Sequence, residues 1–162
     1  CLMPDNVTVA PSPPIAACLE SYQATGLTTV AAATVRAAEA HRFANVGGLE
    51  VERRPDGRLA VRTLQDKGPG RFQVGPTDEA IRAVGRSVIA PRFFELLEEE
   101  GRPVAGHEVD DVPLYQALAA DGAFLVALVE GEYFDLGFPD GYEAARSILD
   151  DHPTWGLGPR QP

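Results

Sequence analysis

The stretch EGEYFDLGFPDGYEAARSILDDHP, residues 130–153, places a strand, a reversal and a helix next to one another. The alternating apolar residues around Tyr133 predict the strand, and Gly137 ends it. Pro139 is typical of the first turn of a helix, and the apolar spacing after it predicts that helix. Asp135 therefore stands at the carboxyl end of a strand, where open α/β sheets tend to place ligands. The alternative is that Asp135 helps to cap the helix or is only solvated.

Further helices and strands alternate along the chain before this stretch. Apolar spacing bounded by proline or glycine predicts helices over residues 13–26, 91–100 and 111–122. Runs of β-branched and apolar residues predict strands over residues 27–35, 80–90 and 124–129. Two alternating segments flank RPDGR within residues 49–64, and they predict a β-hairpin. This alternation predicts an α/β fold with a mixed, mostly parallel sheet flanked by helices.

Length and composition indicate one globular domain. The chain has 162 residues, of which 44% are hydrophobic, enough for a sizeable core. Its net charge of −10 disfavours nucleic acid as a partner. No apolar run approaches the roughly 20 residues that span a bilayer, so we expect no membrane partner. Without a secretory signal pattern, and with Cys1 and Cys18 in no metal or redox motif, we expect a cytoplasmic protein.

Lys67 is the sole lysine among 14 basic residues. A lysine retained in an arginine-biased chain suits a role that needs a compact ammonium charge. Chance survival of one lysine is the alternative, and composition does not decide between the two.

Four short pieces occur in a recognisable order: LMPDN, LQDKGP, AVGRSVIAPRFFELLEE and GEYFDLGFPDGYEAA. This order resembles the carboxyl-terminal half of the sugar-phosphate nucleotidyltransferases, especially the bacterial UTP–glucose-1-phosphate uridylyltransferases. Those enzymes carry a PDD or GDN turn, an EKP motif, a VGRY strand leading to a helix, and YDVG or LDTG before a later helix. The resemblance implies that residues 1–150 are the carboxyl-terminal part of such a domain, and residues 151–162 read as a loose tail. It implies a Rossmann-fold variant that lacks its amino-terminal nucleotide-binding part.

The resemblance implies roles for five residues. Asp5 and Asp135 match the metal-binding aspartates of the family and would hold Mg²⁺ between them. Asn6 matches a residue that contacts the sugar, and Asp66 matches an acid that hydrogen-bonds sugar hydroxyls. Lys67 matches the catalytic lysine that binds the sugar phosphate, where its charge would neutralise the attacking group.

The activity implied by the resemblance is Mg²⁺-dependent transfer of a nucleotidyl group from UTP to glucose 1-phosphate, with release of pyrophosphate. The Gly-rich GxGTR loop that cradles the triphosphate in the family is absent from these 162 residues. We therefore expect these 162 residues to be inactive alone and to need an amino-terminal half. The alternative is a degenerate, non-catalytic module that binds a sugar phosphate or mediates assembly, for example as a homo-oligomer.

A domain cut after its first strands would leave a sheet edge and apolar helix faces uncovered, and such surfaces associate. We therefore predict that the isolated chain self-associates despite its net charge of −10. Light scattering and sedimentation measure this directly. A monodisperse monomer with one cooperative thermal transition would contradict the prediction.

Overall fold

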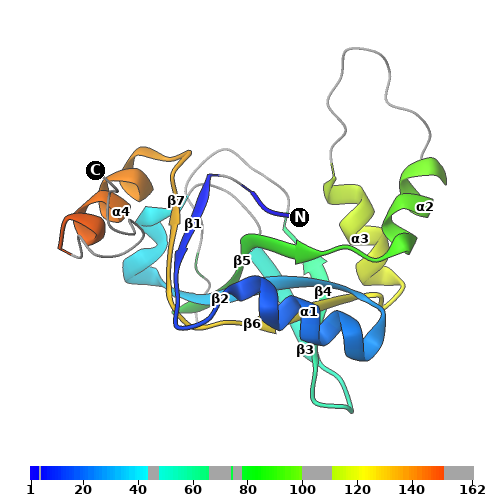
Figure 1. Ribbon diagram of the computed structural model, residues 1–162. Coiled ribbons are helices and arrows are strands. Elements are labelled where there is room, and N and C mark those ends of the chain that lie inside the picture. The colour runs from blue at the N-terminus through cyan, green and yellow to red at the C-terminus, as the bar shows by residue number, and fades with distance from the viewer. Residues whose placement is uncertain (4, 44–47, 66–73, 75–77, 100–110, 152–162) are drawn as a thin grey trace, which may run out of the picture.

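The computed structural model describes residues 1–3, 5–43, 48–65, 74, 78–99 and 111–151. In this part of the chain, two β-sheets and five helices form the fold (Figure 1). The first sheet closes into a barrel in the strand order β2 (Thr28–Arg36), β5 (Glu79–Val88), β3 (Gly48–Arg53), β4 (Leu59–Leu64) and β6 (Phe124–Leu128). The second sheet is an antiparallel ribbon of β1 (Asn6–Val9) and β7 (Glu132–Asp135).

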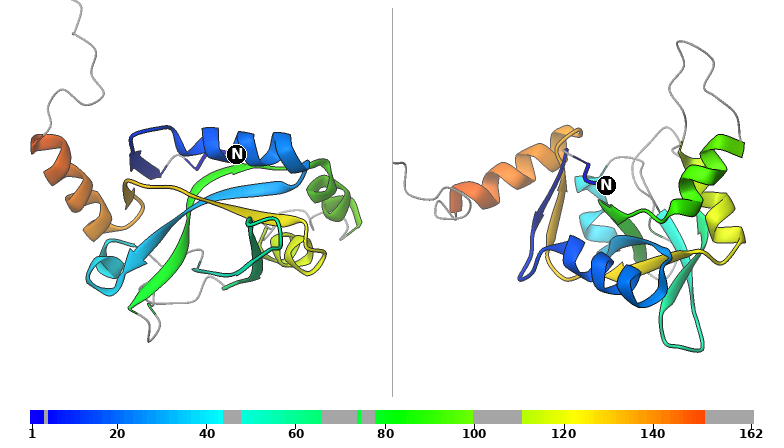
Figure 2. Two further views of the ribbon diagram at one scale, coloured as in Figure 1. Left: turned by 90° about the horizontal axis from the view of Figure 1, so that it is seen from below. Right: turned by 45° about the vertical axis from the view of Figure 1, so that its right-hand side comes forward.

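The helices cover the barrel from several sides (Figure 2). Helix α1 (Pro14–Thr25) packs against β2 and β5. Helices α2 (Pro91–Glu99) and α3 (Val112–Ala120) pack together at one end of the barrel. The 3₁₀ helix η1 (Ala37–Arg42) and α4 (Pro139–Asp151) meet at the other end, beside β7. None of the described helices is long and apolar enough to cross a membrane.

The prediction of a mostly parallel, Rossmann-type sheet is wrong. Strand β6 runs parallel to β2, and every other pair among the described strands is antiparallel. Alternating strands and helices give parallel pairing when each helix returns the chain to a neighbouring strand. Here β5 lies between β2 and β3, and the β3–β4 hairpin joins β6 to close the barrel. These pairings join distant segments, so local periodicity does not encode them.

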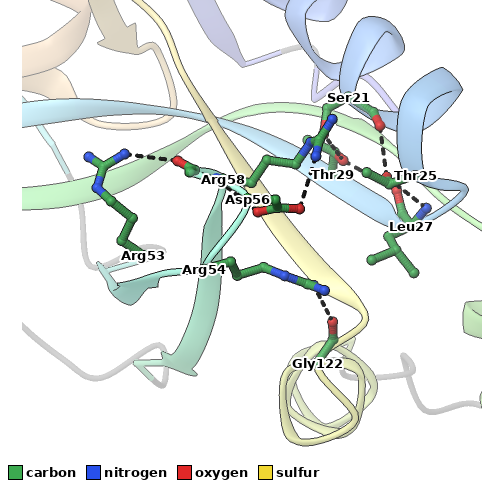
Figure 3. A network of polar contacts seen from close by, with 10 residues as sticks. Ser21, Thr25, Leu27, Thr29, Arg53, Arg54, Asp56, Arg58 and Gly122 are labelled. Carbon is green, nitrogen blue, oxygen red and sulfur yellow. Dashed lines mark hydrogen bonds and ion pairs between the residues drawn. The ribbon is translucent and has the colours of Figure 1, made fainter.

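The helices, the strands and the hairpin that the sequence analysis predicted are confirmed, whereas β1 was not predicted. Helix α1 ends where Gly26 adopts φ 70° and donates its N–H to the Tyr22 carbonyl. The hairpin turns at Asp56, whose carboxylate accepts the Arg58 backbone N–H at 3.1 Å and its guanidinium at 2.9 Å (Figure 3). The backbone N–H, followed by the guanidinium, lowers the pKa of Asp56. Gly57 completes the turn with φ 84°.

Strand β2 is buried on both faces, which explains its apolar sequence. Val30 and Ala32 belong to the apolar cluster that includes α2 and α3. Ala31 and Ala33 point the other way, into a second cluster with Cys18 of α1, as the two-residue period of a strand requires. Cys18 has no exposed surface, and burial raises the pKa of its thiol to about 11. The barrel wall thus separates two cores.

Closure of the barrel removes one ground for expecting self-association. Because its five strands pair in a ring, none of them is a free edge. The β1–β7 ribbon keeps outer edges, and Leu2 and Met3 beside it are 63% and 41% exposed. Self-association of the chain stays a prediction.

Gly85 allows the first residues of the chain to run against β5. The Met3 N–H donates to the Gly85 carbonyl at 2.9 Å, and Leu2 pairs with Arg86. Gly85 has φ 68°, and a Cβ there would lie 2.9 Å from Cβ of Asn6 and 3.0 Å from Cβ of Met3. Both the backbone angle and the space therefore require glycine.

We predict that Gly85→Ala destabilises the fold more than Gly26→Ala does. Both glycines have nearly the same φ, so the backbone term of about 1–2 kcal/mol is shared. A Cβ on Gly26 meets no atom within 4 Å, whereas a Cβ on Gly85 is crowded, which adds about 1–3 kcal/mol. Urea unfolding of the two variants measures the difference. Equal losses of stability would show that Asn6 and Met3 move aside for the added Cβ at no energetic cost.

Candidate functional site

Asp135 and Asp5 lie side by side where the β1–β7 ribbon ends. Asp135 is the last residue of β7 and is paired with Asn6, the first residue of β1. The Leu136 N–H donates to the Asp5 carbonyl at 2.7 Å. The strand pairing therefore brings together Asp5 and Asp135, which lie 130 positions apart in the sequence.

The two carboxylates face the same point beside Gly137. A Cβ atom on Gly137 would lie 3.3 Å from Oδ1 of Asp135 and 3.5 Å from Oδ2 of Asp5. The Gly137 N–H donates to Oδ1 of Asp135 at 3.1 Å, which fixes this carboxylate. Asp135 is 5% exposed, while Asp5 is exposed to solvent. The side chain of Asn6 donates to Oδ1 of Asp5 at 2.9 Å.

Arg82 of β5 holds the buried aspartate, and the sequence reasoning did not find it. One terminal nitrogen lies 3.3 Å from Oδ2 of Asp135, in an ion pair with almost no exposed side-chain surface. The other terminal nitrogen donates to the Ala83 carbonyl at 3.1 Å. The guanidinium carbon lies 4.4 Å from the centre of the Phe43 ring, in a cation–π contact. A charged residue within the apolar strand AIRAVGRSV was the available signal.

Burial destabilises the positive charge of Arg82, and the two nearby aspartates stabilise it. Burial lowers the pKa of the guanidinium, whereas the carboxylates of Asp135 and then Asp5 raise it. Arginine keeps its proton in proteins, so the buried residue is a permanent cation. A buried charge is tolerated only when an opposite charge and hydrogen bonds compensate it. Asp135 therefore has a partner that is already positively charged.

A cavity of about 460 Å³ opens beside this ion pair. Its polar wall includes Asn6, Arg82, Arg86 and Asp135, and its apolar wall includes Tyr115, which stacks on the buried Phe124. The guanidinium of Arg86 donates to the Asn6 carbonyl at 2.7 Å and so fixes this side of the cavity. The volume suits a small molecule, and the wall offers it charges of both signs: the two arginines and the carboxylates of Asp5, Asp111 and Asp135.

Three of the five predicted site residues come together, and two lie outside the described residues. Asp5, Asn6 and Asp135 all line the cavity. Asp66 and Lys67 are outside the described part of the chain, so their roles stay predictions.

The described residues fit a magnesium ion poorly. Both oxygens of Asp135 already have partners, Arg82 and the Gly137 N–H, and one oxygen of Asp5 accepts from Asn6. In the part of the chain that the structure describes, no group of three or more His, Cys, Asp or Glu side chains could hold a metal. A fixed guanidinium beside the carboxylates repels a dication. The Mg²⁺ site at Asp5 and Asp135 stays a prediction.

The fold is similar to that of about half of each of three solved enzymes. The structure superposes on an apo UDP-glucose pyrophosphorylase with a TM-score of 0.66 and 19% identity, covering 93% of this chain and 54% of that one. A UDP-glucose pyrophosphorylase complexed with UDP-glucose gives a TM-score of 0.65 at 21% identity over 93% and 55% of the two chains. A putative glucose-1-phosphate thymidylyltransferase from Bacillus anthracis gives 0.67 at 16% identity over 97% and 55%.

The sequence is also similar to that of one curated protein. It is 24% identical over 143 residues to UTP–glucose-1-phosphate uridylyltransferase 1 of Staphylococcus saprophyticus subsp. saprophyticus, a match over 87% of this chain and 46% of that protein. No family model matches the chain. The chain is thus a distant relative of the UDP-glucose pyrophosphorylases and other sugar nucleotidyltransferases, and it spans about half the length of the curated relative that it matches.

We predict that Arg82→Met lowers the free energy of unfolding by about 3–5 kcal/mol, because it leaves the buried Asp135 carboxylate without its partner. Arg36→Met is the matched control, since Arg36 pairs with Glu79 on the surface and such pairs contribute about 0–1 kcal/mol. The double variant Arg82→Met/Asp135→Asn should recover part of the loss. Thermal and urea unfolding report all three. A loss below about 1 kcal/mol for Arg82→Met would show that the pair does not hold the fold.

Proposed function

We propose that the chain is the sugar-phosphate-binding half of a sugar-1-phosphate nucleotidyltransferase, with glucose 1-phosphate as its ligand and UTP as the nucleotide donor of the whole enzyme. The observation that carries this proposal is the cavity, whose wall holds Arg82 and Arg86 beside Asp5, Asn6 and Asp135, three residues that the sequence resemblance predicts for the site. A solved relative is complexed with UDP-glucose, and another is UTP-bound. A cytoplasmic location stays a prediction.

The chemistry of the proposed reaction is the joining of two anions. An oxygen of the sugar 1-phosphate attacks the α-phosphorus of the nucleotide, and pyrophosphate leaves. Such a reaction depends on holding both phosphates in line and neutralising their charge. In this chain the arginines of the cavity wall provide positive charge, and the Asn6 side chain offers a hydrogen bond to a sugar hydroxyl. The described residues thus bind and orient one of the two substrates.

A second candidate is a module that binds a sugar phosphate without catalysis. The Arg82–Asp135 ion pair favours it, because one of the two carboxylates proposed for the metal is already neutralised. Both candidates share the ligand and differ in the reaction. In a longer protein that contains a nucleotide-binding half, Mg²⁺-dependent release of pyrophosphate from UTP and glucose 1-phosphate would separate them.

We predict that the 162-residue chain binds glucose 1-phosphate but releases no pyrophosphate when UTP is added. Asn6→Ala should weaken binding about threefold to tenfold, the loss expected for one hydrogen bond. Gln23→Ala removes an exposed amide from α1, away from the cavity, and should leave the affinity unchanged. Isothermal titration calorimetry measures the affinity of the unaltered chain and of the two variants for glucose 1-phosphate. Equal affinity for glucose 1-phosphate in the Asn6→Ala variant would remove Asn6 from the site.

If glucose 1-phosphate shows no binding at millimolar concentration, the proposed function is wrong. Glucose 6-phosphate and inorganic phosphate serve as ligand controls. Binding of all three with one affinity would indicate a general anion site, and a preference for glucose 1-phosphate would support the sugar-phosphate pocket.

A further inference from the structure

The fold does not use all the hydrogen-bond donors of Arg82. Its terminal nitrogens are bound to Asp135 and to the Ala83 carbonyl. Its Nε–H has no partner among the described residues, although Arg82 is only 2% exposed. A buried N–H without a partner is unfavourable, and such groups call for a physical explanation. Arg82 also lines the cavity, so a ligand oxygen that reached this buried donor would satisfy it.

The same guanidinium interacts with both carboxylates, Asp5 and Asp135, that a metal ion would need as ligands. It is paired with Asp135, and it is close enough to Asp5 for that carboxylate to favour its charged form. A dication at these carboxylates would have to displace Arg82 or bind beside a fixed positive charge. Displacement is opposed by the Phe43 ring and the Ala83 carbonyl, which hold the guanidinium on its other sides.

We propose that Arg82 takes the place of a divalent metal in this chain: its guanidinium neutralises Asp135, donates to the phosphate of a ligand in the cavity, and makes phosphate binding independent of Mg²⁺. The inference rests on the proposed function only for the identity of the ligand, a sugar 1-phosphate. Arginine suits this role because its charge is permanent and its planar donors match phosphate oxygens.

A purely structural ion pair is the rival explanation. It would join β5 to β7, leave the cavity without a phosphate site at Arg82, and change ligand affinity only through unfolding. The proposal instead requires that Arg82 set two properties of the folded protein: the affinity for the phosphate ligand and the exclusion of metal. Both can be measured on protein that is shown to be folded.

The first experiment uses the unaltered chain. Binding of Mn²⁺, a spectroscopic substitute for Mg²⁺, is followed by electron paramagnetic resonance without any sugar phosphate. Glucose 1-phosphate is titrated by calorimetry in EDTA and again in Mg²⁺. We expect no Mn²⁺ site at millimolar concentration and less than about twofold change in glucose 1-phosphate affinity, since ligands that do not interact show no coupling. A Mn²⁺ site, or binding of glucose 1-phosphate only with Mg²⁺, overturns the proposal.

The second experiment compares Arg82→Gln and Arg82→Lys with Arg36→Gln, an exposed control on the same barrel. Circular dichroism first establishes that each variant is folded. We expect Arg82→Gln to weaken glucose 1-phosphate binding at least about tenfold, the effect of losing a charge-assisted hydrogen bond, and to gain a Mn²⁺ site. Arg82→Lys should retain part of the affinity and exclude Mn²⁺. A folded Arg82→Gln variant with unaltered affinity and no Mn²⁺ site would establish the structural rival.

The two arms separate this inference from the proposed function. If glucose 1-phosphate fails to bind in either buffer, the proposed function fails and takes the phosphate part of the inference with it. The Mn²⁺ arm needs no sugar phosphate, so it decides the metal part by itself. If Arg82→Gln does not fold, the measurements on the unaltered chain still decide whether a metal takes part, and the affinity of Arg82→Lys for glucose 1-phosphate decides whether Arg82 binds the phosphate.

Discussion

The buried ion pair between Arg82 and Asp135 joins the two sheets of the molecule. Arg82 belongs to β5 in the barrel, and Asp135 ends β7 in the ribbon. Because the Gly137 N–H also binds Asp135, the pair positions the turn that leads into α4. The first turn of α4 packs so closely that a Cβ on Gly141 would collide with the carbonyls of Asp135 and Arg42. Asp135 therefore connects the barrel, the β1–β7 ribbon and the turn before α4.

The same interaction shapes the candidate site. Pairing of β1 with β7 brings Asp5 next to Asp135, an arrangement that suggests a metal site when the carboxylates are considered alone. A guanidinium beside them changes that balance, since it neutralises the buried carboxylate and adds a fixed positive charge to the cavity wall. The chain thus has the fold of part of the similar solved enzymes, and in it a guanidinium is paired with the buried carboxylate beside the cavity.

Local sequence patterns predicted most of the helices and strands, but they did not predict which distant strands pair with one another. Gly26 and the Pro55–Gly57 turn marked their boundaries because one residue's backbone geometry sufficed. The ring of strands depends on contacts between distant segments, so the mostly parallel sheet was expected wrongly, and the four-residue β1 was missed. In the candidate site, the sequence correctly predicted that Asp135 stands at the end of a strand. Arg82 was missed because its strand was judged by its apolar residues.

The most direct test of the account is the position of the cation at Asp135. Crystals of the chain grown with Mn²⁺ and glucose 1-phosphate, with diffraction measured at the manganese absorption edge, distinguish a guanidinium from a metal ion. We predict density for Arg82 against Oδ2 of Asp135, a phosphate within hydrogen-bonding distance of that side chain, and no anomalous peak beside the two aspartates. An anomalous peak between Asp5 and Asp135, with Arg82 turned away, would contradict it.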